Sequence, residues 1–386
     1  MPWRKRGGPR NTSPAYLQKT APHGSGGDVW EGRDFYISLF SPDPTDPGAG
    51  RVLWEELPTV SVGDRDQLEL PLTLAEFLEA PHPMPTNKSP GMDGLSVEFY
   101  RTFWDILGPD LATVLAESLQ CGVLPFLCRR AVLALLLKKG DLHDLRNWRP
   151  VSLLSTDYKI VAKAISLRLG SMMADVIHPD QTYTVPGRSI FDNLFLVRDL
   201  LELGRRDGLS FALLSLDQEK AFDRVDHGYP LGTLQVFGFG PQFVSFVQVL
   251  YASAECLVRL NWTLTEPVSF GRVRQGCPLS GQLYALAVEP FLCLLCRRLT
   301  GLVLREPELR LVLSAYADDM LLVVQDPGGL ARWRLARPSI RQPPPPESTG
   351  SRALAWWWGT GGSILVSKLK KYGLDECTIR NLLKLR

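Results

Sequence analysis

Acidic residues mark the ends of apolar stretches in the second half of the chain. Asp318 and Asp319 lie between two runs of aliphatic residues, and Asp217 directly follows the apolar run at 211–216. Neighbouring side chains on a regular strand point to opposite faces, so Asp318 and Asp319 can face one cleft only at the tip of a tight hairpin. The pattern therefore predicts that three carboxylates meet where strands end.

Such a cluster of carboxylates favours divalent cations. Three carboxylates about 4 Å apart repel one another by roughly 4 kcal/mol per pair at an effective dielectric constant near 20. Mg²⁺ would relieve this repulsion, since it binds carboxylate oxygens together with substrate phosphates. Two such ions about 3.5–4 Å apart can hold the attacking and leaving oxygens of a phosphoryl transfer. For Asp318 and Asp319 alone, a solvated turn is an equally good interpretation.

Two further segments contain residues suited to a polar ligand. The segment 275–281 precedes a long apolar stretch, and its Gly276 and Pro278 predict a sharp turn. Free amides at the start of a helix suit an anion or a base pair, although an ordinary turn and helix cap explains the segment as well. In the second segment Phe222 follows Asp217 by five residues, and a core side chain is the default interpretation of a single Phe.

The elements that would position these residues are helices mixed with short strands. We expect helices from Pro109 to Gly122, from Asp157, after a Ser189 cap, and from a Ser280 cap to Leu299. We expect strands at 133–137 and 211–216, a hairpin formed by 256–261 and 268–273, and a strand, tight turn and strand over 311–324. The elements show no regular βαβ rhythm, which predicts an α+β fold with an antiparallel sheet.

Composition excludes several classes of protein. The 386 residues are 45% hydrophobic and 22% charged, which is typical of a globular protein and not of a disordered chain, a collagen or a coiled coil. No apolar run reaches 18 residues and no secretory signal is present, so we expect a nuclear or cytoplasmic protein without a membrane partner. The net charge of +2 neither implies nor excludes binding to nucleic acid. Cys293 and Cys296 have CxxC spacing without a second pair, which favours buried thiols over zinc.

Composition also divides the chain into three parts. Residues 1–59 are rich in Gly, Pro and Arg and are predicted to be mostly disordered. Residues 60–326 have the apolar periodicity of a globular domain, whereas residues 327–386 are rich in Pro, Trp and Gly and have little periodicity.

Taken together, the segments of the central part resemble the reverse transcriptase of non-LTR retrotransposons, the long interspersed element type. The matching segments occur in the family's order and at plausible spacing within residues 60–326. They are Lys88–Gly94 (KSPGMDG), 137–141 (LKKGD), 147–153 (NWRPVSL), 181–188 (QTYTVPGR), 215–223 (SLDQEKAFD), 274–280 (RQGCPLS) and 316–319 (YADD).

The resemblance implies a right-hand polymerase with fingers and palm that copies RNA into DNA. Its partners would be an RNA template, a DNA primer and dNTPs. By position, Asp217, Asp318 and Asp319 would be the catalytic carboxylates. They would hold two Mg²⁺ ions, with Mn²⁺ as a substitute, and the main-chain carbonyl of Gln218 would be a further ligand.

The resemblance also implies nucleotide-binding residues in both subdomains. Lys138 and Arg149 would hold the triphosphate, a role that suits a point charge and a bidentate fork. Phe222 would reject a ribose 2′-hydroxyl by its bulk. Gln275 and Gly276 would lie against the incoming nucleotide and the template base.

The chain departs from the family pattern at several positions. Thr184 replaces an aromatic residue, Tyr183 replaces a small residue, and Gly281 replaces a common Pro. The family continues after its third palm motif with a further palm segment, a primer grip and a thumb, which the residues from Pro327 onward do not resemble. We therefore expect a copy truncated after that motif, with fingers and palm but no thumb. The alternative function is an inactive remnant that at most binds nucleic acid.

Overall fold

The computed structural model describes residues 27–41, 47–138, 140–209, 211–216, 218, 221–260, 262–304, 310–325, 353–358 and 364–365. The helices are α1 (Gly27–Phe40), α2 (Pro47–Leu53), α3 (Val62–Leu68), α4 (Leu74–Glu79), α5 (Val97–Thr102), α6 (Trp104–Cys121), α7 (Phe126–Arg129), α8 (Thr156–Gly170), α9 (Met173–Val176), α10 (Ile190–Asp207), α11 (Gly228–Val236), α12 (Pro241–Tyr251) and α13 (Ser280–Arg298). The strands are β1 (Arg130–Leu137), β2 (Trp148–Leu154), β3 (Phe211–Leu216), β4 (Glu255–Leu260), β5 (Thr263–Leu264), β6 (Val268–Ser269), β7 (Leu302–Val303), β8 (Arg310–Leu311), β9 (Leu313–Tyr316), β10 (Asp319–Val324), β11 (Ala353–Trp358) and β12 (Ile364–Leu365). This mixture confirms the predicted α+β class.

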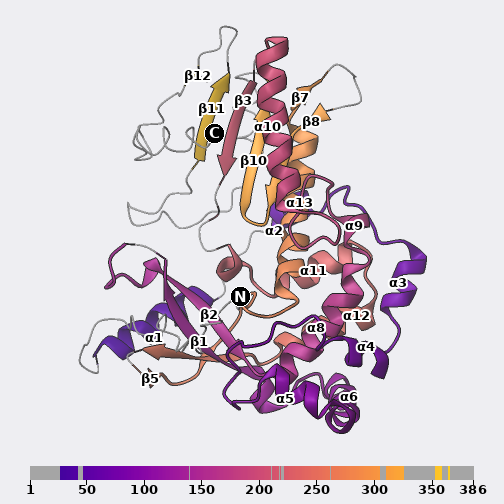
Figure 1. Ribbon diagram of the computed structural model, residues 1–386, viewed down its shortest axis with the longest axis vertical. Helices are drawn as coiled ribbons and strands as arrows, with labels where there is room; N and C mark the ends of the chain where they lie inside the picture. The colour runs from indigo at the N-terminus through magenta and orange to yellow at the C-terminus, as the bar shows by residue number, and fades with distance from the viewer. Residues whose placement is uncertain are drawn as a thin grey trace, which may run out of the picture.

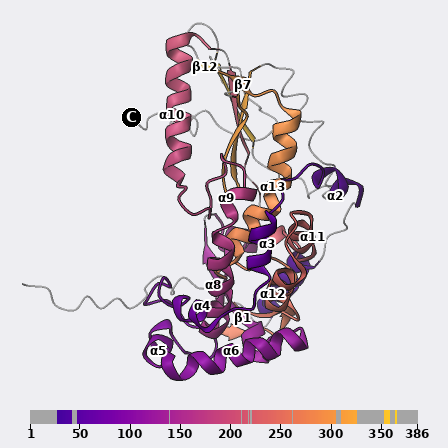
Figure 2. The ribbon, with the colours of Figure 1, turned by 90° about the vertical axis from the view of Figure 1, so that its right-hand side faces the viewer.

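One sheet has the strand order β12-β11-β3-β10-β9 and lies between two helices (Figures 1 and 2). β10 is antiparallel to both β3 and β9. Because side chains alternate along a strand, β3 contributes side chains to a hydrophobic core on each face of the sheet. Ala212 and Leu214 pack in the core that contains the apolar face of α13, whereas Phe211 and Leu213 pack in the core that contains Leu200 of α10.

The helix α10 begins where its sequence predicts. The Ser189 side chain accepts from the helix backbone while Asp192 bonds back to the Ser189 N–H, which completes a capping box. Gly208 ends the helix in the left-handed conformation, with φ of 63°. Two other predicted boundaries are wrong. α6 begins at Trp104, a buried residue, with Pro109 inside the helix, and the Ser280 hydroxyl contacts the Tyr251 hydroxyl at 3.2 Å instead of capping α13.

The second sheet has the order β2-β1-β4-β5, with β6 paired to β4. β1 and β2 form an antiparallel pair, and β4 runs parallel to β1. α1 covers this sheet through Tyr36 and Phe40, whose rings contact each other, and the Phe40 ring also contacts Phe270. α1 lies in a stretch that composition predicted to be loop; the burial of these two aromatic side chains explains why the segment is helical instead.

Most remaining helices share one hydrophobic core with α8, whose residues are largely buried. None of the helices in the described ranges is long and apolar enough to cross a membrane. The segment 88–94 rests on the start of α8, where the Thr156 hydroxyl donates to the Leu95 carbonyl at 2.6 Å. Gly91 approaches the backbone of Ser155 so closely that a Cβ on residue 91 would lie 2.5 Å from the Ser155 nitrogen.

We predict that Gly91→Ala destabilises the fold by about 1–3 kcal/mol, because the added methyl group would clash with the backbone of Ser155, which cannot rotate away as a side chain can. The matched control is Gly63→Ala in α3, where a Cβ would have its nearest neighbour at 4.0 Å. Urea denaturation followed by circular dichroism measures both. Equal midpoints for the two variants would contradict the close approach.

Candidate active site

Two of the three predicted carboxylates lie at the tip of the β9–β10 hairpin, Asp318 on the turn and Asp319 at the start of β10. Tyr316 pairs with Asp319 across the ladder, which leaves Ala317 and Asp318 as the two turn residues. Ala317 is buried and has φ of 55°, an unfavourable value for a residue with a Cβ. Asp318 is half-buried and Asp319 is exposed. Both carboxylates thus lie at the tip of a hairpin, as the sequence predicts.

The strand that leads to the third carboxylate ends beside this turn. Leu216, the last residue of β3, pairs with Met320, which directly follows Asp319. Asp217 itself lies outside the described residues. Gln218 is described, and its side-chain oxygen accepts a hydrogen bond from the Tyr284 hydroxyl at 2.7 Å. Among the described residues, no three His, Cys, Asp or Glu side chains are grouped to hold a metal ion.

The conformation of the turn is supported by Gln181, which is fully buried. Its Oε1 accepts from the Ala317 N–H at 3.3 Å and from the Tyr183 N–H at 3.1 Å. The neighbouring backbone also pairs with β9, because the Ala315 N–H donates to the Asp180 carbonyl at 2.9 Å. Gln181 therefore holds the strained turn residue from behind the hairpin. Gln181 is the first residue of the 181–188 motif, and nothing in the sequence predicts this supporting role.

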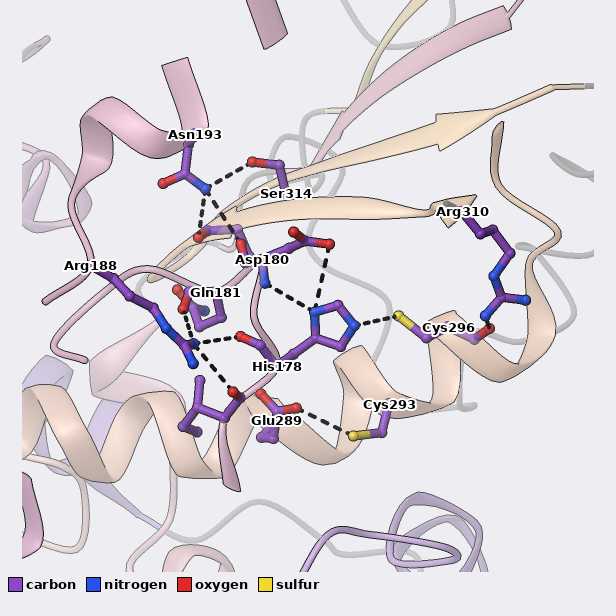
Figure 3. A network of polar contacts seen from close by, with 12 residues as sticks. His178, Asp180, Gln181, Arg188, Asn193, Glu289, Cys293, Cys296, Arg310 and Ser314 are labelled. Atoms are coloured by element: carbon purple, nitrogen blue, oxygen red, sulfur yellow. Dashed lines mark hydrogen bonds and ion pairs between the residues drawn. The ribbon is translucent and has the colours of Figure 1, made fainter. Parts of the chain in front are cut away.

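A polar network in turn supports the segment that carries Gln181 (Figure 3). Arg188 donates through Nη1 to the carbonyls of His178 at 2.7 Å and Gln181 at 3.0 Å. Asn193 of α10 donates to the Ser314 hydroxyl at 2.8 Å and to the Ala315 carbonyl at 3.1 Å. These contacts connect α10, the segment and β9, so they position the hairpin without reaching its tip.

The network extends to α13 through His178. The Asp180 N–H donates to Nδ1 of His178 at 3.2 Å, so Nε2 carries the proton of the neutral ring and faces Sγ of Cys296 at 3.4 Å. Cys293 donates to the buried Glu289 at 3.3 Å. Burial, and after it the charge of Glu289, raises the pKa of the Cys296 thiol to about 12. The two thiols are thus half-buried and protonated, which agrees with the sequence interpretation.

Lys138 directly follows β1, and Arg149 lies on the paired strand β2. Arg149 is exposed and lies opposite Leu136. Lys138 is two residues from Leu136 and its backbone N–H bonds to the Asn147 carbonyl at 2.9 Å, which continues the ladder. Since residues two apart point to the same face, Lys138 and Arg149 lie on one face of the hairpin.

Gln275 and Gly276 lie against β2. The Gln275 carbonyl accepts from the Ser152 N–H at 2.8 Å, and a Cβ on Gly276, which has φ of 112°, would lie 2.6 Å from the Ser152 oxygen. This position requires glycine for both reasons. The side-chain nitrogen of Gln275 lies 2.9 Å from each carboxylate oxygen of Asp223, which is buried. Asp223 thereby fixes the orientation of this amide, a role that sequence reasoning missed because the partners are 52 residues apart.

Phe222 lies in a short 3₁₀ turn, Phe222–Arg224, directly after Ala221. Its ring stacks on Tyr284 of α13, with centroids 4.4 Å apart. Tyr183 joins this group and reaches the hairpin, since its ring contacts both Phe222 and Tyr316. Burial, followed by the charges of Tyr316 and Asp318, raises the pKa of the Tyr183 hydroxyl, while Arg149 opposes the rise. One predicted residue from each sheet, Asp318 and Arg149, therefore acts electrostatically on the Tyr183 hydroxyl.

A family model described as reverse transcriptase (RNA-dependent DNA polymerase) matches residues 136–333, about half of the chain. The chain belongs to the reverse transcriptase family. The match includes β3 and the β9–β10 hairpin, which are next to the predicted carboxylates, together with β2 and the end of β1. The two sheets and their helices are consistent with the fingers and palm of this family.

Relatives from retrotransposons support the narrower assignment. The chain is 67% identical over 301 residues to the transposon TX1 149 kDa protein of Xenopus laevis, covering 78% of this chain and 23% of that protein. It is 27% identical over 245 residues to a Pol polyprotein of the type-2 retrotransposable element R2DM of Drosophila melanogaster, covering 63% of this chain and 22% of the relative. A Pol polyprotein of a type-1 retrotransposable element R2 of Popillia japonica is 27% identical over 191 residues, covering 49% of this chain and 26% of the relative.

The chain thus spans about a quarter of the length of these curated relatives. The comparisons confirm the resemblance to the reverse transcriptase domain of non-LTR retrotransposons.

We predict that Gln181→Met lowers the free energy of unfolding by about 1–3 kcal/mol, because it leaves the N–H groups of Ala317 and Tyr183 without their acceptor. The matched control is Gln235→Met, a substitution of an exposed side chain. Amide hydrogen exchange should also show faster exchange at Ala317 in the Gln181 variant alone. Unchanged exchange there would contradict the support of the turn.

A pH dependence of stability follows from Glu289, whose pKa burial raises to about 7. In the unfolded chain the pKa of a Glu carboxyl is about 4.3, so folding favours the neutral form of Glu289. The stability that this neutral form provides is therefore lost as the pH rises through 7. We predict that Glu289→Gln gains stability relative to the wild type between pH 5 and pH 8, by up to roughly 3 kcal/mol. Denaturant titrations at both pH values measure this, and a pH-independent difference would contradict it.

Proposed function

We propose that this chain is an RNA-directed DNA polymerase domain that adds dNTPs to the 3′-hydroxyl of a DNA primer annealed to an RNA template. The observation that carries the proposal is the position of the Asp318-Asp319 turn beside the end of β3, the strand that leads into Asp217. This arrangement lies within the stretch that matches the reverse transcriptase family.

The donor set suits hard divalent cations. Asp217, Asp318 and Asp319 would supply carboxylate oxygens, with the main-chain carbonyl of Gln218 as a further ligand. Oxygen donors of this kind favour Mg²⁺, and Mn²⁺ is a substitute. Two bound ions would neutralise charge on the attacking and leaving oxygens.

The residues of the other sheet would bind the nucleotide. Lys138 and Arg149 share a face of the β1–β2 hairpin and would hold the triphosphate. Gln275 and Gly276, which are bonded to or packed on β2, would contact the incoming nucleotide and the template base. Phe222 would contact the sugar and exclude a 2′-hydroxyl.

In this assignment the β1–β2 sheet is the fingers and the β3–β10–β9 sheet with α10 and α13 is the palm. The primer 3′-hydroxyl would attack the α-phosphorus of the dNTP and lose its proton to solvent. A new P–O bond forms as the bond to the leaving pyrophosphate breaks. The chain's own residues act by positioning and by charge, which supply most of the catalysis in phosphoryl transfer.

We predict that the full chain extends an oligo(dT) primer on poly(rA) with dTTP and Mg²⁺, and that Asp318→Asn combined with Asp319→Asn lowers the rate at least about a hundredfold. The double variant keeps the side-chain volumes while removing both charges. Chelation of the metal should abolish extension, and added Mg²⁺ or Mn²⁺ should restore it.

Asp199→Asn is the matched control, because it removes an exposed carboxylate of α10 that pairs only with its neighbour Arg198 among the contacts of the described chain. It should extend the primer at the wild-type rate. No extension by folded wild-type protein would favour an inactive remnant that binds nucleic acid, and equal extension by the double variant would remove these carboxylates from the reaction.

A further inference from the structure

The three residues that depart from the family pattern contact one another. A Cβ on Gly281 would lie 2.6 Å from Cγ2 of Thr184 and 3.2 Å from the Tyr183 hydroxyl oxygen. Both distances are shorter than ordinary van der Waals contact, so the first turn of α13 has room for Tyr183 and Thr184 only because residue 281 is glycine. The three departures are therefore one compensated change in packing.

The consequence of this packing is that an aromatic ring enters the site. The Tyr183 ring meets Tyr316, which precedes the two turn residues, with centroids 5.2 Å apart and an interplanar angle of 73°. It meets Phe222 at 6.4 Å and 81°. Both are edge-to-face contacts, which are favourable for aromatic pairs. Tyr183 thus joins the hairpin to the turn that carries Phe222.

Phe222 is held from its other side by Tyr284. The two rings are stacked at 4.4 Å and 21°, and Tyr284 is fully buried. The Tyr284 hydroxyl also donates to Gln218. Tyr284 is therefore fixed, and Phe222 lies between one rigid ring and Tyr183. If the Tyr183 ring were removed, the Phe222 ring could turn away from Tyr284 into the space that the Tyr183 ring had filled.

We propose that Tyr183 is a positioning residue that sets sugar specificity by holding the Phe222 ring in place. The inference rests on the proposed function, in which Phe222 contacts the sugar of the incoming nucleotide. A ring that cannot move aside excludes the larger ribose with its 2′-hydroxyl, whereas a ring free to move admits it. Tyr183 acts through Phe222 and need not touch the nucleotide. Gly281 is the complementary small residue that admits Tyr183.

The test is single-nucleotide primer extension on poly(rA)–oligo(dT) by the full chain, comparing kcat/KM for dTTP with that for UTP or, to isolate the sugar, ribothymidine triphosphate. In Tyr183→Ala we expect the preference for the deoxynucleotide to fall about 2- to 10-fold, the factor that corresponds to one edge-to-face contact. Tyr183→Phe keeps the ring and should keep the preference. Phe191→Ala, an exposed aromatic of α10, is the matched control.

A merely structural role would lower kcat/KM for both nucleotides equally, and an unchanged preference in Tyr183→Ala would overturn the proposal. Loss of preference in Tyr183→Phe would also overturn it, since the hydroxyl and not the ring would then matter. Failure of the proposed function is distinct, because the wild type would then incorporate neither nucleotide. Unchanged preference in Phe222→Ala would show that Phe222 does not contact the sugar.

A second pair of variants keeps the test informative if Tyr183→Ala does not fold. Gly281→Ala places a methyl group against Thr184 and Tyr183 and should lower the preference. Adding Thr184→Ser removes the Cγ2 atom that a Cβ would meet first and should restore the preference at least in part. If Gly281→Ala folds and keeps the wild-type preference for the deoxynucleotide, the proposed packing is contradicted.

Discussion

The hydrogen bond from the Ala317 N–H to Oε1 of Gln181 is the contact on which the arrangement of the site depends. Ala317 has φ of 55°, a conformation that costs free energy in a residue with a Cβ and persists only where surrounding contacts require it. Those contacts are the β9–β10 register on one side and the buried Gln181 on the other. A glycine would relieve the strain but would loosen the turn. The strained alanine therefore keeps Asp318 on the turn and Asp319 at the adjoining start of β10.

The elements predicted most accurately from the sequence are those whose signals are local. The cap at Ser189 and the apolar run of β3 each depend on neighbouring residues, and the structure confirms them. α1 could not be predicted, because it is stabilised by contact between Phe40 and Phe270, which are far apart in the chain. The start of α6 was wrong for a related reason, since burial of Trp104 adds a turn ahead of the proline.

The candidate site shows the same division. The residue types and order of the carboxylates were visible in the sequence, and the hairpin that carries Asp318 and Asp319 has the predicted geometry. The residues that hold the site were not visible, because Gln181 and Asp223 act through partners more than 50 positions away. The departures from the family pattern at Tyr183 and Gly281 look like separate losses in the sequence, whereas in space they compensate each other.

The proposed chemistry requires two sheets that do not pair with each other to keep a fixed distance. The bond from Ser152 of β2 to the Gln275 carbonyl provides one link, and Gly276 allows the two backbones to approach closely. Asp223 continues the link, because it binds Gln275 and directly follows Phe222. A chain of contacts therefore runs from the strand that carries Arg149 to the ring proposed to contact the sugar. Each contact in it is short and several are buried, so the backbone that carries Arg149 and the Phe222 ring would be held at a fixed separation. Gly276 and the buried Asp223 thus connect the two sheets, although neither is proposed to take part in the chemical step.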